Sequence, residues 1–91
     1  MALFTVDFNR MISDPARGLT QALPLGYETQ YPALRDLQEG QRVIVAMPGE
    51  LWAEARATCR SDERGRCWYG ELVGRVHYYD EGASGGVGTG A

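Results

Sequence analysis

Residues 41–80 read QRVIVAMPGELWAEARATCRSDERGRCWYGELVGRVHYYD, and this stretch decides the fold. Runs rich in valine, alanine and aromatic residues alternate there with the turn sequences Pro48-Gly49 and RSDERGR. Such runs, bounded by such turn residues, are typical of strands and hairpins. The stretch therefore predicts a small all-β unit with a central strand over 42–47, a hairpin around the charged tip, and a last strand over 75–80.

The two cysteines suggest a register for the hairpin. If Cys59 faces Cys67 across the tip, the alanines of the first strand share a face with Tyr69. Small side chains opposite a large ring suit the interior of a strongly curved barrel. This register places Trp52 and Trp68 together on the other face, which we expect to lie outward or at the rim.

The first 36 residues are expected to form an extension packed on this unit. Residues 2–8 place apolar side chains at every second position, as in a half-buried strand. Between residues 14 and 32 a proline or glycine recurs every few positions, so we expect an irregular loop that packs through its leucines and tyrosines. An arm reaching a neighbouring subunit is the alternative. Residues 32–37, PALRDL, predict one helical or 3₁₀ turn.

The order of features after residue 36 resembles the SH3-like and Tudor-like small-barrel superfold. A pattern of the form L-x-x-G-x-R-V-x-V is followed by a tryptophan in the second strand and a last strand of the form V-x-Y-x-D. The residues that carry it are Leu37, Gly40, Arg42, Val43, Val45, Trp52, Val76, Tyr78 and Asp80. The resemblance implies a mainly β protein with a five-stranded SH3-like barrel over residues 37–81, and the N-terminal extension over residues 1–36 lies outside it. It also implies binding of proline-rich segments, methylated cations or other partners in an aromatic groove.

Length and composition narrow the class of protein. A chain of 91 residues makes one domain with one core. Its net charge of −3 argues against coating nucleic acid through bulk electrostatics. No apolar run approaches the roughly 20 residues that cross a membrane, and the first residues do not read as a secretory signal, so we expect a cytoplasmic protein. The glycine-rich residues 82–91 hold too little apolar surface to order themselves and are expected to form a disordered tail.

The aromatic residues of the second half are the leading candidate for a binding site. Flat rings pack against rigid or cationic ligands at a low entropic cost. The candidate partner-binding residues are Trp52, Trp68, Tyr69 and Tyr79. The alternative is that Tyr69 belongs to the core and the exposed rings serve only subunit contacts.

The arginines of the hairpin tip are a second candidate. Arg60, Arg64 and Arg66 crowd the hairpin tip and could contact a phosphate backbone, but Asp62 and Glu63 lie among them. A tip of mixed sign is usually solvated surface. Nucleic acid is therefore a less favoured partner than protein.

The cysteines and the single histidine allow three interpretations. Cys59 and Cys67 could form a cross-strand disulfide, remain two buried thiols, or join His77 at a metal. The metal reading is disfavoured because the spacing lacks paired C-x-x-C motifs. With one histidine and no phosphate-binding glycine loop, we expect neither an enzyme nor a cofactor.

These observations favour a small, non-enzymatic interaction module that binds a protein or peptide through its aromatic face, with self-association into a homodimer as a variant. One alternative is a protein associated with nucleic acid or transcription that uses the arginine-bearing tip. The other is an accessory subunit of a larger enzyme.

Overall fold

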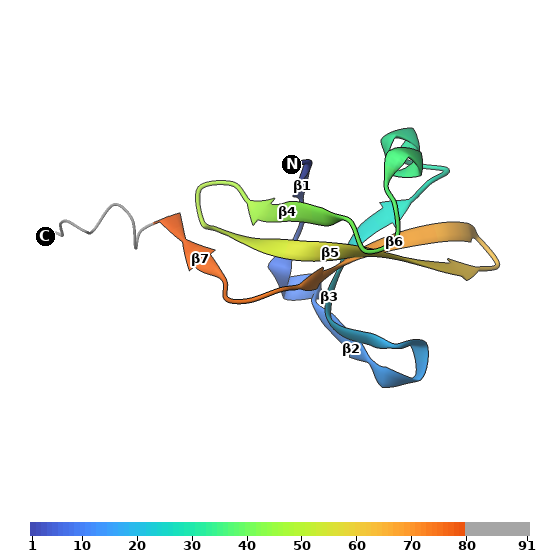
Figure 1. Ribbon diagram of the computed structural model, residues 1–91, viewed down its shortest axis with the longest axis horizontal. Coiled ribbons are helices and arrows are strands. Elements are labelled where there is room, and N and C mark those ends of the chain that lie inside the picture. The colour runs from blue at the N-terminus through green and yellow to red at the C-terminus, as the bar shows by residue number, and fades with distance from the viewer. Residues whose placement is uncertain (80–91) are drawn as a thin grey trace, which may run out of the picture.

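A computed structural model describes residues 1–79 and shows a mainly β protein (Figure 1). The strands are β1 (Leu3–Thr5), β2 (Ile12–Asp14), β3 (Leu19–Tyr27), β4 (Arg42–Met47), β5 (Leu51–Asp62), β6 (Gly65–Leu72) and β7 (His77–Tyr78). Three 3₁₀ turns connect them, η1 (Phe8–Arg10), η2 (Pro15–Arg17) and η3 (Pro32–Asp36). None of the helical segments in residues 1–79 is long and apolar enough to cross a membrane.

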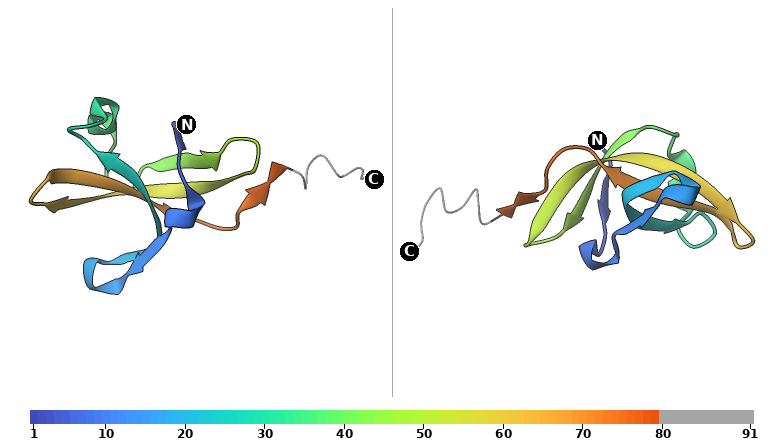
Figure 2. Two further views of the ribbon diagram at one scale, coloured as in Figure 1. Left: turned by 180° about the vertical axis from the view of Figure 1, so that it is seen from behind. Right: turned by 90° about the horizontal axis from the view of Figure 1, so that it is seen from below.

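The strands form a single curved sheet in the order β1-β4-β5-β6-β3-β2, with β7 paired to the beginning of β5. Figure 2 shows the strong twist of this sheet and the β2–β3 hairpin turning away from its centre. The ends of this order, β1 and β2, do not pair with each other, so the sheet is open. The expected closed five-stranded SH3-like barrel is therefore corrected to an open sheet, to which the first 36 residues contribute three strands.

The predicted central strand is confirmed as β4. It pairs in parallel with β1 on one side and antiparallel with β5 on the other. Because both edges of β4 are paired and Val43 and Val45 lie in the main core, its mostly apolar sequence fits this place. The predicted turn at Pro48-Gly49 is confirmed too, and Gly49 adopts a φ of 81° that favours glycine.

The hairpin of β5 and β6 has a register one residue away from the predicted one. Cys59 lies opposite Trp68, and Cys67 lies opposite Arg60. Asp62 pairs with Gly65, which leaves a two-residue loop, the length that hairpins most favour. The local cause is a hydrogen bond of 2.7 Å in which the Arg64 amide donates to the Asp62 carboxylate and tightens the turn.

This one-residue shift exchanges the faces of β6, because side chains alternate along a strand. Trp68 now shares a face with the alanines of β5, whereas Tyr69 faces the other way. The main core on the Trp68 face is formed by Leu23, Leu34, Leu37, Val43, Val45, Ala53, Ala55, Ala57 and Trp68. A smaller cluster on the opposite face contains Leu19, Ala22, Cys67 and Tyr69. Both faces of the hairpin are therefore covered.

The region between residues 14 and 32 contains an ordered strand and not only the expected irregular loop. β3 pairs antiparallel with β6 from Ala22 to Tyr27, and with β2 only near its beginning. Pro24 lies past the stretch that β2 covers and beside an irregularity in the pairing with β6, which is where a strand tolerates proline. The breakers at Pro24 and Gly26 thus mark a bulged edge, and they do not end the strand.

The short elements agree in part with the sequence. The helical turn predicted over 32–37 is confirmed as η3. The predicted strands over 2–8 and 75–80 are present but shorter, as β1 and β7. The tail predicted over 82–91 lies outside the described residues.

Candidate functional site

The predicted aromatic group does not lie on one face. Trp68 is 1% exposed and belongs to the main core, which corrects the expectation that it lies outward with Trp52. Its indole Nε1 donates a hydrogen bond of 2.7 Å to Glu28 Oε2. Tyr69 is 7% exposed and packs in the smaller cluster on the other face. Neither ring therefore belongs to an exposed aromatic face shared with Trp52.

The other two candidates lie at the opposite end of the sheet from the hairpin tip. Trp52 is half-buried and stacks on His77, with ring centres 4.3 Å apart and planes inclined by 16°. Tyr79 follows β7 and is 44% exposed, and its amide donates to the carbonyl of Glu50. Stacking with His77 covers part of the Trp52 ring, so this end offers less open aromatic surface than expected.

Two of the three tip arginines are engaged within the protein. Arg60 Nε donates to the carbonyl of Arg17 at 2.7 Å, and Nη1 donates to that of Cys59 at 2.8 Å. Arg66 Nε lies 3.3 Å from a carboxylate oxygen of Glu28. These contacts join the hairpin to the segments around η2 and after β3. Both guanidinium groups therefore help to hold the fold together.

The cysteines are both free thiols in the structure. Cys59 and Cys67 occupy opposite faces of the hairpin because Cys59 pairs with Trp68 and Cys67 pairs with Arg60, one residue out of register. The cross-strand disulfide considered from the sequence is therefore not formed here. Within residues 1–79, no three histidine, cysteine, aspartate or glutamate side chains gather as a metal site would require.

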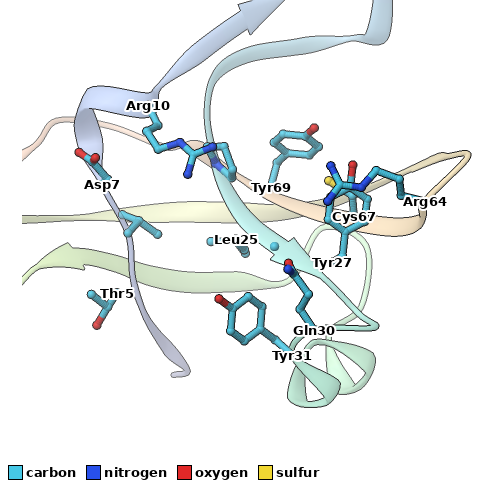
Figure 3. Close-up of a pocket in the computed structure, with 13 residues that line it drawn as sticks. Thr5, Asp7, Arg10, Leu25, Tyr27, Gln30, Tyr31, Arg64, Cys67 and Tyr69 are labelled. Atoms are coloured by element: carbon cyan, nitrogen blue, oxygen red, sulfur yellow. The ribbon is translucent and has the colours of Figure 1, made fainter.

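The structure contains a cleft of about 650 Å³ along the second half of β3 (Figure 3). Its walls come from three stretches that are distant in sequence, residues 5–10, 24–31 and 64–69. Thr5, Val6, Asp7 and Arg10 come from the β1–η1 region, Pro24–Tyr27 from β3, Gln30 and Tyr31 from the following loop, and Arg64, Cys67 and Tyr69 from the hairpin. We call this space between β1 and the second half of β3 the seam cleft.

β1 presents unpaired backbone groups at one wall of the seam cleft. The Ile44 amide donates to the carbonyl of Ala2, and the Val6 amide donates to the carbonyl of Ala46. In a parallel ladder, alternate residues direct both backbone groups to the same neighbour. The even-numbered residues of β1 therefore bond to β4, and the N–H and C=O of Thr5 point away from β4. Since β1 ends the sheet, no further strand takes them up among the described residues.

The opposite wall is shaped by Gly26 and Tyr31. Gly26 adopts a φ of 125°, and a Cβ there would lie 2.6 Å from Tyr31 Cδ2. Only glycine permits both this backbone conformation and this close ring contact. Pro24 has no N–H to offer a new strand, so this edge is protected against pairing. The open edge of the seam cleft is thus the β1 side.

The cleft carries more positive than negative side chains. The Arg64 guanidinium lies 4.7 Å from the centre of the Tyr27 ring, which it covers. Arg10 reaches the cleft from η1, and in the described part of the chain it forms no hydrogen bond or ion pair through its side chain. Asp7 is the single carboxylate among the lining residues, and it accepts a hydrogen bond of 2.9 Å from the amide of Asn9.

A hydrogen bond fixes Tyr27 beside the cleft, and packing in the smaller cluster holds Tyr69. The Tyr27 hydroxyl donates to Asp62 Oδ2 at 2.5 Å, which raises the pKa of Tyr27 and lowers the pKa of Asp62. Burial, helped by the neighbouring Cys67 thiol, raises the pKa of Tyr69. Tyr31 is 57% exposed at the rim. The rings of Tyr27 and Tyr69 are held in place, while the Tyr31 ring offers open surface.

Sequence reasoning missed most of this site, although a signal was present. Leu19, Leu23, Leu25 and Tyr27 are apolar or aromatic. They fall on alternate positions of the segment, interrupted only at Gln21, which is the period-two pattern of a strand. Tyr69 and Arg64 were predicted as site residues, and both line the cleft, although with different neighbours from those expected. The chain matches no family model, no curated protein and no solved structure with which it was compared.

Proposed function

We propose that the protein is a non-enzymatic interaction module that binds an extended segment of a protein partner in the seam cleft. The segment adds to the sheet as a new strand beside β1. This mode of recognition uses main-chain hydrogen bonds for affinity and adjoining pockets for side-chain selection.

The outward-facing backbone of Thr5 carries this proposal. It lies at the wall of a cleft large enough for several side chains, and Leu25 and Tyr31 supply ring and apolar surface beside it. Leu3, the other residue of β1 with outward backbone groups, has a side chain that is 60% exposed. An incoming strand would give these groups hydrogen-bond partners and cover the exposed leucine.

The length of β1, which is only three residues, limits the strength of such pairing. A short edge strand offers few main-chain hydrogen bonds, each with a net contribution of about 0.5–1.5 kcal/mol. Side chains of the ligand must supply the remaining affinity from the walls of the cleft. Dissociation constants in the micromolar range are the expected result.

A displayed library of random octapeptides tests the proposal. We expect selection against the folded protein to yield binders that the Thr5→Pro variant does not retain. Proline removes the outward N–H of Thr5, while the bonds between β1 and β4 use only the neighbouring residues. Thr5→Val is the matched control, because it changes the side chain and keeps the N–H.

Circular dichroism and thermal unfolding establish that each variant is folded before binding is compared. Binders that Thr5→Val retains and Thr5→Pro loses support strand addition. A library that yields no binder, or binders that both variants retain equally, would overturn the proposal.

A further inference from the structure

We infer that the segment taken up by the seam cleft is an acidic peptide, with its carboxylates received by Arg10 and Arg64. This inference rests on the proposed function and adds the chemical class of the partner. The inference is drawn from the charge of the cleft walls, because strand addition alone does not determine which side chains the peptide carries.

The two arginines approach the cleft from different elements. Figure 3 shows Arg10 extending from the side of η1 and Arg64 extending from the hairpin, with the ring of Tyr69 between them in this view. Both guanidinium groups retain hydrogen-bond donors, because no ion pair within 4.0 Å joins either of them to a described carboxylate. By contrast, Arg66 already lies beside Glu28.

The acidic groups near the cleft keep their charge, but hydrogen bonds engage their carboxylate oxygens. The Asp7 carboxylate accepts a hydrogen bond from Asn9 at the start of η1. The Asp62 carboxylate accepts from the Tyr27 hydroxyl and from the backbone amide of Arg64, so its oxygens are engaged. The lining side chains thus include two guanidinium groups without a carboxylate partner among the described residues and a single carboxylate, and a carboxylate is the peptide side chain that complements the guanidinium groups.

A peptide suits the cleft better than a nucleic acid does. The edge of β1 offers alternating N–H and C=O groups, and a peptide backbone supplies a partner for each kind, whereas a phosphate backbone supplies acceptors only. The net charge of −3 also opposes a ligand with a charge on every residue more strongly than one with two or three carboxylates. Nucleic acid remains an outcome that the test distinguishes.

The experiment starts from the octapeptides selected on the wild-type protein, synthesised with acetylated and amidated ends so that only side chains carry charge. Their affinities are measured by titration calorimetry for the wild type and for Arg10→Gln, Arg64→Gln and Arg56→Gln. Arg56 is an exposed arginine of β5 outside the cleft, so Arg56→Gln is the control for net charge. A single-stranded oligonucleotide of eight residues is titrated in parallel.

We expect the selected peptides to be enriched in aspartate and glutamate over the starting library. Arg10→Gln and Arg64→Gln should each weaken binding by about 3-fold to 10-fold, as for a charge-assisted hydrogen bond that is partly exposed to solvent. Arg56→Gln should change affinity less than about 2-fold, because exposed charges outside the cleft are screened by salt.

Selected peptides that are neutral or basic, or equal losses in all three variants, would overturn the acidic preference and leave strand addition standing. Tighter binding of the oligonucleotide, lost in the same two variants, would overturn it in favour of a nucleic acid. A library that yields no binder overturns the proposed function itself, and the inference with it.

Discussion

The indole nitrogen of Trp68 donates a hydrogen bond of 2.7 Å to Glu28 Oε2, although the Trp68 side chain is 1% exposed. The same carboxylate oxygen lies 3.3 Å from Nε of Arg66. Glu28 follows β3 directly, so this contact joins the end of β3 to β6 on the core side of the sheet. A hydrogen bond between a buried donor and a charged acceptor is among the stronger hydrogen bonds in a fold.

Removal of the Glu28 carboxylate should therefore destabilise the protein. Glu28→Ala leaves the Trp68 N–H buried without a partner, and we expect a loss of about 1–3 kcal/mol in the free energy of unfolding. Glu28→Gln keeps an acceptor oxygen and should lose less. Urea denaturation followed by tryptophan fluorescence, in a Trp52→Phe background so that only Trp68 reports, measures both. Equal stabilities of Glu28→Ala and the wild type would contradict this role.

The hydrogen bonds of the Glu39 carboxylate lead us to expect that the folded protein loses stability in acid. It accepts hydrogen bonds from the Thr58 hydroxyl at 2.5 Å and from the Cys59 amide at 2.9 Å, and the Thr58 hydrogen bond is the main cause of its lowered pKa. A lowered pKa means that folding favours the ionised form. The stabilisation is therefore complete above the ordinary pKa of glutamate and is lost as the pH falls through the lowered value.

Glu39→Gln should accordingly be less stable than the wild type at neutral pH, and the difference should shrink at an acidic pH below the ordinary pKa of glutamate. Urea denaturation at both pH values measures it. Glu63→Gln, at an exposed carboxylate of the hairpin tip, is the control and should change stability at neither pH. A difference between Glu39→Gln and the wild type that persists in acid would show that the charge of Glu39 is not the cause.

The contact between Gly26 and Tyr31 predicts the outcome of two glycine substitutions. Gly26→Ala meets both a positive φ and the Tyr31 ring, whereas Gly49→Ala meets a positive φ with nothing within 4 Å. We expect backbone strain of about 1–3 kcal/mol in both, with an added loss in Gly26→Ala from displacement of the ring. Thermal unfolding compares them. Peptide affinity should fall in Gly26→Ala alone, and an equal fall in both would argue against Tyr31 as a wall of the cleft.

The register of the hairpin predicts which thiols can pair. After mild oxidation and unfolding, the wild-type protein should still show two reactive thiols per chain, because Cys59 and Cys67 lie on opposite faces. The double variant Cys59→Ser with Arg60→Cys places a thiol directly opposite Cys67, at a separation that a disulfide spans. It should lose both thiols on oxidation. A disulfide in the wild type, and none in the double variant, would contradict the register of the structure and support the one predicted from the sequence.

Local patterns in the sequence predicted the elements that depend on neighbouring residues. The apolar run of β4, the Pro48-Gly49 turn, the β5–β6 hairpin and the η3 turn all follow from residue types and spacing. The register did not follow, because one residue decides which face carries Trp68 and the two cysteines suggested a pairing that the short loop at Asp62 does not allow.

The candidate site was harder to predict because its parts meet only in the folded sheet. Leu25 and Tyr31 come from a region in which proline and glycine conceal the strand pattern, and Arg10 comes from the short η1 turn ahead of it. Pro24 is tolerated because β3 loses its second neighbour there, which is a tertiary fact that local propensity does not contain. The open edge of β1 likewise depends on the order of strands in the sheet.

Hydrogen exchange at the amide of Thr5 tests strand addition beside β1 most directly. In the free protein this amide points away from β4, so it should exchange rapidly, whereas the Val6 amide donates to Ala46 and should exchange more slowly. With the tightest selected octapeptide at saturation, two-dimensional NMR should show exchange at Thr5 slowed by about 10-fold or more, as for an amide that gains a partner in a ladder. Unchanged exchange at Thr5 in the saturated complex would contradict strand addition at β1.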